Sequence, residues 1–366
     1  MTSATREALW ERLRSSGLVE GEPPAPQGER APWFLRVMLG IAGWIGALFL
    51  LGFLGAALPW LVRGAASAIV AGAAACVGAA LLFGSSAGAS GKSAGSSPRG
   101  DFLSQFAFAI SLTGQALLAM GLSHLMEHRS FAALAFLLAL QQAVLFLFVP
   151  SFAHRVWCAW TGTAAAVYGL GQLGLGPLAP ALLAAAFATL GRRVYEGRIE
   201  LRSAALHGLA ISLITALSVY GGGLAWSTLF RDASGPLGWP EWVGSALSGA
   251  VLLWLVAVLL RAHGVRLGSL QARAALAVAA VLALATLKAP GLAPAIVILL
   301  TGFANGNRLL VGAGIVALVL YLSSYYYLLE VTLLTKSAVL FFTGIALLGA
   351  RMLLNRAWPD REVQRA

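Results

Sequence analysis

The chain has 366 residues, of which 59% are hydrophobic and 11% are charged, and its formal net charge is +11. Soluble globular domains are about half apolar and about 25% charged, so this composition excludes an ordinary water-soluble fold. The two cysteines, Cys76 and Cys158, each lie in an apolar stretch without CxxC spacing. This pattern favours buried free thiols over a disulfide or a metal site, and no cofactor is predicted.

The first 32 residues precede any apolar block, so the first block is not expected to be a cleavable signal peptide. Residues 5–19 place Leu9, Trp10 and Leu13 on one helical face with charges opposite, and Gly17 lies near the end. We predict a short cytoplasmic amphipathic helix that either lies on the membrane or docks a partner. The segment 20–31, rich in proline and charge, then forms a linker.

Apolar blocks of membrane-crossing length follow one another almost to the C-terminus. A bilayer core about 30 Å thick needs about 20 helical residues, and lipid leaves the backbone of an open strand unsatisfied, so each block predicts a helix. The predicted spans are residues 34–58, 64–84, 102–123, 130–149, 155–175, 177–191, 204–224, 242–261, 270–288, 290–304, 308–329 and 337–354. The sequence therefore predicts an all-α, polytopic transmembrane bundle of about twelve spans over residues 33–354, with a flexible linker at 85–100 and a basic tail at 355–366.

The lysines and arginines separate into two unequal groups when the segments between spans are assigned alternately to the two sides of the membrane. Of the 25 basic residues, 20 lie on the same side as the N-terminus. The other five lie on the opposite side, and they are Arg63, Arg129, Arg231, Lys288 and Lys336. Cytoplasmic segments carry the excess of Lys and Arg, so both termini are predicted to be cytoplasmic. The basic residues then line the anionic inner leaflet, and this placement argues against nucleic acid as the partner.

Three glutamines are predicted to lie at membrane depth. Gln115 is near the middle of the third span, and Gln141 and Gln142 are in the fourth. Each polar side chain there needs a partner inside the bundle, because lipid offers none. The sequence leaves two readings open, namely hydrogen bonds between helices and a polar path or binding cavity.

A short motif in a predicted outer connector resembles a zinc-binding pattern. His124, Glu127 and His128 match HxxEH, which on a helix brings two imidazoles and a carboxylate together. No third ligand is fixed by spacing, and the connector is short. The motif is therefore a weak candidate for a metal site, and a polar outer turn is the simpler interpretation.

The connector between the last two predicted spans combines opposite charges with hydroxyl groups. Glu330 and Lys336 flank the apolar turn VTLLT, and Thr332 and Ser337 lie beside them. Charges near membrane depth cost about 2.5–3.5 kcal/mol on insertion scales, so they are rarely without a role. The two charges either pair with each other at the outer surface or contact a substrate, a proton or a partner.

Two short apolar segments share a sequence. Leu178-Ala179-Pro180-Ala181 recurs as Leu292-Ala293-Pro294-Ala295, and each opens an apolar stretch that is short for a crossing. Paired short segments interrupted by proline can mark transporter sites built from broken helices. We nevertheless expect both to cross, because otherwise the arginines of residues 192–202 would lie outside.

Four blocks of the sequence resemble a known family. They are LWERLRSSGLV (9–19), PWFLRVMLGIAGWIGALFLLGFL (32–54), SLTGQALLAMGL (111–122) and YYYLLEVTLLTKSAVLFFTGIALLGAR (325–351). Together they are similar to the bacterial multi-pass membrane proteins grouped as domain of unknown function 4401, and the last block is also similar to a related multi-pass family of unknown function. The resemblance implies the bacterial inner membrane as the location and a GDYXXLXY-type envelope protein as a partner. It implies no catalytic residues.

Three functions follow from these features. The leading hypothesis is a non-enzymatic inner-membrane component of an envelope assembly, with the Glu330 to Ser337 turn facing its partner. The second is a small-molecule or ion permease that uses the three glutamines and the two short segments. The third is a zinc-dependent membrane hydrolase at the HxxEH motif.

Overall fold

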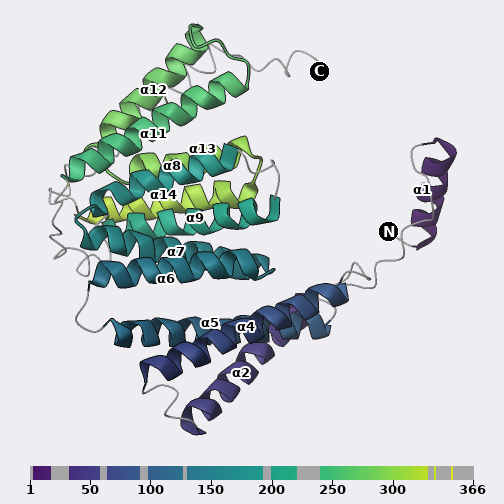
Figure 1. Ribbon diagram of the computed structural model, residues 1–366. Coiled ribbons are helices and arrows are strands. Elements are labelled where there is room, and N and C mark those ends of the chain that lie inside the picture. Colours follow the sequence, from purple (N-terminus) through teal and green to yellow (C-terminus); the bar gives the residue numbers. More distant parts are fainter. Residues whose placement is uncertain are drawn as a thin grey trace. The chain divides into compact units, whose positions relative to one another are not determined.

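A computed structural model of the chain contains helices and connecting turns throughout its described part (Figure 1). The structure describes residues 3–17, 33–57, 64–90, 98–126, 130–192, 199–220 and 240–328, with the single residues Leu334 and Leu348.

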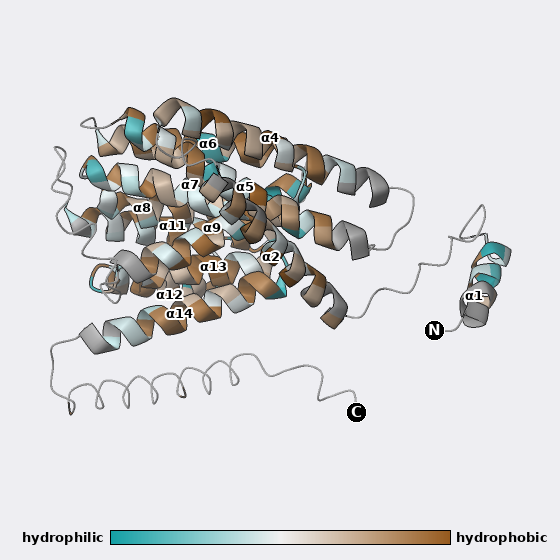
Figure 2. Ribbon diagram, turned by 90° about the horizontal axis from the view of Figure 1, so that it is seen from below, coloured by the Kyte–Doolittle hydropathy of each residue, from teal (hydrophilic) through white to brown (hydrophobic). Residues whose placement is uncertain are grey.

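Twelve α-helices and one 3₁₀ helix make up the described residues. In chain order they are α1 (Ser3–Ser15), α2 (Trp33–Ala57), α4 (Ala65–Ser90), α5 (Pro98–Leu125), α6 (Phe131–Phe148), α7 (Phe152–Gln172), η1 (Gly176–Leu178), α8 (Ala179–Arg192), α9 (Ile199–Tyr220), α11 (Glu241–Ala262), α12 (Leu270–Thr286), α13 (Leu292–Ala304) and α14 (Arg308–Leu328). Apolar residues run along most of the length of the helices from α2 onward (Figure 2). The all-α fold class is therefore confirmed for this part of the chain.

The predicted spans coincide with helices up to residue 328, and the last predicted span, 337–354, lies outside the described residues. Several boundaries differ because helical hydrogen bonding does not stop where the apolar block stops. Helix α4 continues to Ser90, so the predicted linker is helical over 85–90, and α5 begins at Pro98, a residue suited to the first helical position. Helix α9 begins at Ile199, ahead of its apolar block.

Five of these helices are long and apolar enough, by length and composition, to cross a membrane. They contain the segments Ala65–Ser85, Phe102–Leu125, Phe131–Phe148, Ile199–Leu217 and Trp242–Ala262. Shorter apolar helical segments are Met38–Phe49, Leu270–Thr286, Leu292–Ala304 and Arg308–Ser324. The protein is thus a helical membrane protein, whereas a total of twelve spans and the cytoplasmic placement of both termini stay predictions.

The chain forms two compact units, residues 1–169 and 170–366. In the first unit, α4 and α5 pack in opposite directions through glycines. A Cβ atom on Gly72 would lie 2.7 Å from the carbonyl oxygen of Gly114, and one on Gly121 would lie 2.9 Å from that of Ala65. Small residues let two helix backbones approach closely, which is how membrane helices gain packing energy without a hydrophobic driving force.

In the second unit, α8 and α11 run in the same direction. At the beginning of α11, a Cβ on Gly244 would collide with the carbonyl of Pro177 in η1, and at the other end Arg192 and Ala262 line one pocket. Helix α13 pairs with α14 in a hairpin, in which Gly302 faces Leu310 and Gly314 faces Leu299.

The C-terminal ends of α11 and α13 are closed by glycine caps. Gly264 and Gly306 have φ values of 71° and 61°, in the left-handed region that glycine adopts at little cost. In each cap the glycine N–H and the next N–H bond back to carbonyls of the last turn, as Gly264 to Arg261 and Val265 to Leu260 show. The last carbonyls of these two helices therefore have backbone donors of their own.

Candidate functional site

A buried hydrogen-bond network in the first unit centres on the side-chain amide of Gln115, near the middle of the apolar segment Phe102–Leu125. The amide oxygen of Gln115 accepts from Gln142 Nε2 at 3.0 Å and from Trp157 Nε1 at 3.2 Å. Its nitrogen donates to Ser111 Oγ at 3.2 Å and lies 3.3 Å from His154 Nε2. One amide thus uses its full hydrogen-bonding capacity and joins α5, α6 and α7.

The contacts of His154 define its tautomer. A carboxamide nitrogen can only donate, so Nε2 of His154 is the acceptor of the Gln115 contact. Ser111 Oγ, 2.7 Å from the same Nε2, then donates its proton to the ring. The imidazole proton is therefore on Nδ1, which faces the sulfur of Cys158 at 3.5 Å.

Aromatic rings enclose the histidine. The centroid of Phe83 in α4 lies 5.7 Å from that of His154, and the centroid of Phe108 in α5 lies 5.9 Å away, both in edge-on geometry. Phe108 also contacts Trp157 and Trp44 in the same geometry. Ser111 and His154 are both fully buried. A polar network in such an apolar, water-poor surrounding is strong when its members are paired and costly when they are not.

Helical spacing places these polar groups together. Ser111 and Gln115 are four residues apart on α5, and His154 and Cys158 are four apart on α7, so each pair shares a helix face. The short Val149–Ser151 connector turns α6 into α7 and brings Gln142 beside the same face. Arg155 Nε donates to the carbonyl of Phe146 at 3.3 Å, which holds this connector.

Two oxygen atoms of the network have no partner. Gln141 Nε2 donates to the backbone carbonyl of Gln115 at 3.4 Å, but the side-chain oxygens of Gln141 and Gln142 are buried without a hydrogen bond. Buried polar atoms in native proteins are nearly always paired with protein or water, so each of these oxygens is a place where a donor would bind.

The arrangement of Ser111 and His154 is that of a hydroxyl activated by a base, but the third group is a thiol rather than a carboxylate. Both reacting groups are sealed from the surface, so a substrate cannot reach them in this conformation. Among the described residues no three His, Cys, Asp or Glu side chains are grouped to hold a metal ion. The network can hold helices together or pass a proton.

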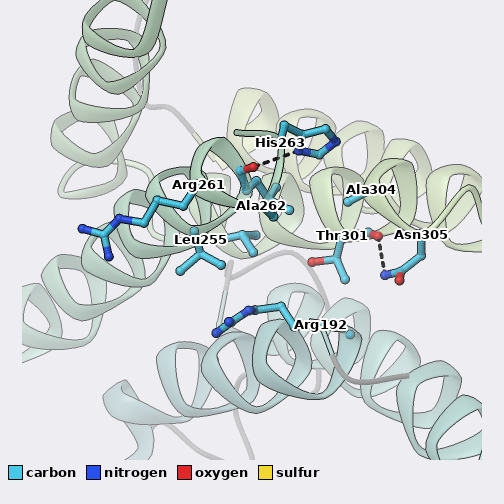
Figure 3. A pocket seen from close by; sticks show the side chains of 11 residues that line it. Arg192, Leu255, Arg261, Ala262, His263, Thr301, Ala304 and Asn305 are labelled. Carbon is cyan, nitrogen blue, oxygen red and sulfur yellow. Dashed lines mark hydrogen bonds between the residues drawn. The ribbon is translucent and has the colours of Figure 1, made fainter. Parts of the chain in front are cut away.

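A second polar feature is a pocket of about 540 Å³ in the second unit, at the C-terminal ends of α8, α11 and α13 (Figure 3). Arg192 and Arg261 extend to one side of it, with Leu255 between them, and Thr301 and Asn305 come from the opposite side. The guanidinium carbon of Arg192 lies 5.4 Å from the ring centroid of Trp254.

The residues predicted as sites have different outcomes. The three glutamines lie together in one hydrogen-bond network. The side chain of Gln115 is at the centre of this network, where a cavity was one of the two expectations. Glu330, Thr332, Lys336 and Ser337 lie outside the described residues, and the outer-turn hypothesis stays a prediction.

The zinc motif is described only at its first residue. His124 is exposed near the end of α5, and Glu127 and His128 lie outside the described residues. The hypothesis of a zinc site stays a prediction. Metal analysis of the purified protein tests it, and a result without zinc would contradict it.

The two short segments that share a sequence are short helices in the structure. Helix α8 has 14 residues and α13 has 13, and they pack against each other. Pro180 and Pro294 are buried near their beginnings. The close approach requires Gly191, because a Cβ there would collide with the methyl group of Thr301.

Ser111, His154 and Cys158 of the network, and the pocket residues, were not predicted from the sequence. The predicted fifth span began at residue 155 and left His154 in a connector, whereas α7 begins at Phe152. The signal that could have found Ser111, His154 and Cys158 is the i, i+4 spacing of polar residues inside apolar helices.

A family model with the description "Domain of unknown function (DUF4401)" matches residues 32–357. No curated protein and no solved structure matches the chain.

Proposed function

The chain belongs to the family described as domain of unknown function DUF4401, and we propose that it is a non-enzymatic component of a bacterial inner-membrane assembly. Its task is then to hold a partner at the membrane rather than to convert a substrate. The observation that carries the proposal is the pairing of Gln115, whose amide bonds to Ser111 on its own helix and to groups of α6 and α7.

This pairing supports a scaffold because it gives the polar groups at membrane depth a structural use. A hydrogen bond between membrane helices contributes on average about 0.6 kcal/mol and at most about 1.7 kcal/mol, so several bonds to one amide fix the arrangement of three helices. The sealed Ser111 and His154 pair offers no surface for a substrate. A fixed helical body with little mass outside the membrane is suited to presenting a binding surface.

The partner-facing surface in this proposal is the turn that contains Glu330, Thr332, Lys336 and Ser337. Its opposite charges and hydroxyl groups would meet complementary groups of a protein on the outer side of the membrane. The partner class is a GDYXXLXY-type envelope protein, which the family resemblance implies.

Co-purification tests this surface. The full-length chain and a GDYXXLXY-type protein from the same organism are co-expressed, and the partner recovered with the tagged chain is measured for the wild type, Glu330→Ala with Lys336→Ala, and the control Arg266→Gln. Recovery should fall several-fold for the double variant only. Equal recovery for all three, or no recovery with any, contradicts the proposal.

A permease is the second candidate, and the unpaired oxygens of Gln141 and Gln142 favour it. Two acceptors without donors inside an apolar bundle could bind a proton-carrying or amide-bearing solute, or water, in a conformation that opens the network. Helices α8 and α13, short and buried at their prolines, would then be the moving elements.

Reconstituted vesicles distinguish a scaffold from a permease that conducts protons. With the full-length protein, proton flux under a potassium diffusion potential is followed by an internal pH dye, and Gln142→Leu is compared with Thr113→Val, which loses a bond within its own helix only. A scaffold gives the flux of empty vesicles in every case. A permease gives flux in the wild type and in Thr113→Val, and loses it in Gln142→Leu.

A further inference from the structure

The pocket at the ends of α8, α11 and α13 has the composition of an anion site. Two arginines and no carboxylate are among its described lining residues. An Arg guanidinium is always charged and presents a planar fork of donors that matches the oxygens of a phosphate group. The excess positive charge therefore favours an oxyanion there.

Thr301 gives an independent indication of a ligand. Its side chain is only 2% exposed and lines the pocket, and its hydroxyl has no hydrogen-bond partner. The methyl group lies against Gly191. The hydroxyl oxygen points to the side on which Leu255 and Arg192 lie (Figure 3). A buried hydroxyl without a partner is a donor that a bound oxyanion would satisfy.

Arg261 is not needed to close the end of α11. Cations at a helix C-terminus commonly offset the partial negative charge of its last carbonyls. At α11 and α13, however, those carbonyls already accept N–H groups from the glycine caps at Gly264 and Gly306. The positive charge of Arg261 is therefore not used to satisfy these carbonyls, and it is available to bind a ligand.

Arg192 is held in place by Trp254, whose ring lies 5.4 Å from the guanidinium carbon. Stacking on a ring leaves the in-plane N–H donors of a guanidinium able to bind oxygen. An arginine fixed in this way loses less side-chain entropy when it binds a ligand than a free one would.

The position and size of the pocket narrow the class of ligand. Helix α11 contains a segment of membrane-crossing length that ends at Ala262, so a pocket at this end lies at the level of lipid headgroups. Its volume of about 540 Å³ exceeds that of a phosphate group, and Leu255, Val258 and Leu259 give it an apolar wall. This combination suits a phosphate group attached to an apolar body.

We propose that this pocket binds the phosphate group of an anionic ligand through Arg192, Arg261 and the hydroxyl of Thr301, with the apolar wall receiving the rest of the molecule. The proposal is independent of the partner-binding role, because the pocket lies in the second unit and uses none of the residues assigned to the partner.

Native mass spectrometry of the full-length protein in detergent tests a lipid source. Phosphatidylglycerol and phosphatidylcholine are titrated in turn, and occupancy is compared among the wild type, Arg192→Gln with Arg261→Gln, Thr301→Val and Arg266→Gln. Arg266 is an exposed arginine outside the pocket and serves as the control for general charge. We expect tighter binding of phosphatidylglycerol, weakened roughly tenfold or more in the double variant, a few-fold in Thr301→Val, and unchanged in Arg266→Gln.

Thermal unfolding in sodium phosphate and in sodium chloride of equal ionic strength tests a soluble source. If phosphate raises the melting temperature of the wild type and of Arg266→Gln but not of the double variant, the site takes a free phosphate group. If only phosphatidylglycerol depends on the arginines, the source is a lipid headgroup. The proposal is overturned if the two lipids bind equally and phosphate has no effect on the melting temperature. It is also overturned if Arg266→Gln loses as much phosphatidylglycerol binding as the double variant.

The single variant Arg261→Gln keeps the test usable if the double variant fails to fold. Arg261 is exposed at the end of α11, and this variant leaves the contact of Arg192 with Trp254 intact. A several-fold loss of phosphatidylglycerol or phosphate binding in a folded Arg261→Gln protein supports the proposal. Unchanged binding of both probes in Arg261→Gln and in Thr301→Val contradicts it.

Discussion

The hydroxyl oxygen of Ser111 lies 2.7 Å from Nε2 of His154, and this contact ties the middle of α5 to the first turn of α7. Both side chains are fully buried, so water cannot replace either one as the hydrogen-bond partner of the other. The pair therefore links two helices whose contact depends on polar groups rather than on apolar packing alone.

A double-mutant cycle measures this link. Ser111→Ala and His154→Leu should each lower the free energy of unfolding, and their coupling energy should be about 1 kcal/mol, within the range for hydrogen bonds between membrane helices. The measurement is reversible unfolding of the four proteins in mixed detergent micelles. A cycle of Thr113→Val with His154→Leu is the control, because Thr113 bonds to Ala109 of its own helix and should add to His154 without coupling. Additive effects of Ser111 and His154 would show that the contact contributes nothing specific.

The glycine contact of α4 with α5 gives a second prediction. A Cβ on Gly114 would lie 2.8 Å from both the Gly72 carbonyl and the Cys76 sulfur, so Gly114→Ala must push the helices apart. We expect a loss of about 1–3 kcal/mol in the free energy of unfolding. Gly78→Ala on α4 is the matched control, since nothing lies within 4 Å of its Cβ and alanine favours the helix by up to about 1 kcal/mol. If both variants lose the same stability, the close approach is not real.

The two cysteines provide a prediction about burial. Cys76 and Cys158 are 5% and 1% exposed, so N-ethylmaleimide should label neither in native membranes and both after denaturation. Ser16→Cys, at an exposed position just after α1, should be labelled at once under native conditions. Mass spectrometry of the labelled peptides reads the result. Rapid native labelling of Cys158 would mean that the network around His154 opens to the surface.

The helices could be predicted from the sequence because each follows from a local property. Apolar length sets the number of helices, and Gly, Pro and Arg mark where the apolar blocks stop, as at Arg192, Arg261 and Arg308. The misplaced boundaries at Ser90 and Ile199 are polar extensions, which hydropathy does not register although the backbone hydrogen bonds continue.

The candidate sites could be predicted only in part, because they depend on which helix faces meet. Gln115, Gln141 and Gln142 were found because polarity at membrane depth is a local signal. His154, which Gln115 contacts, was missed, since it lies in the first turn of α7 and only packing turns it toward α5. The proposed phosphate pocket is lined by the ends of three helices that are far apart in the sequence. No local sequence pattern therefore predicts that the hydroxyl of Thr301 lacks a hydrogen-bond partner there.

The membrane map, on which the outer-turn proposal depends, is tested most directly by cysteine labelling in intact cells. Glu196→Cys and Ala233→Cys place one new thiol each in the predicted segments between spans 177–191 and 204–224 and between spans 204–224 and 242–261, while the buried native cysteines keep the background low. A membrane-impermeant maleimide should label Ala233→Cys from outside and should reach Glu196→Cys only after the cells are made permeable. Labelling of Glu196→Cys in intact cells, with protection of Ala233→Cys, would contradict the map.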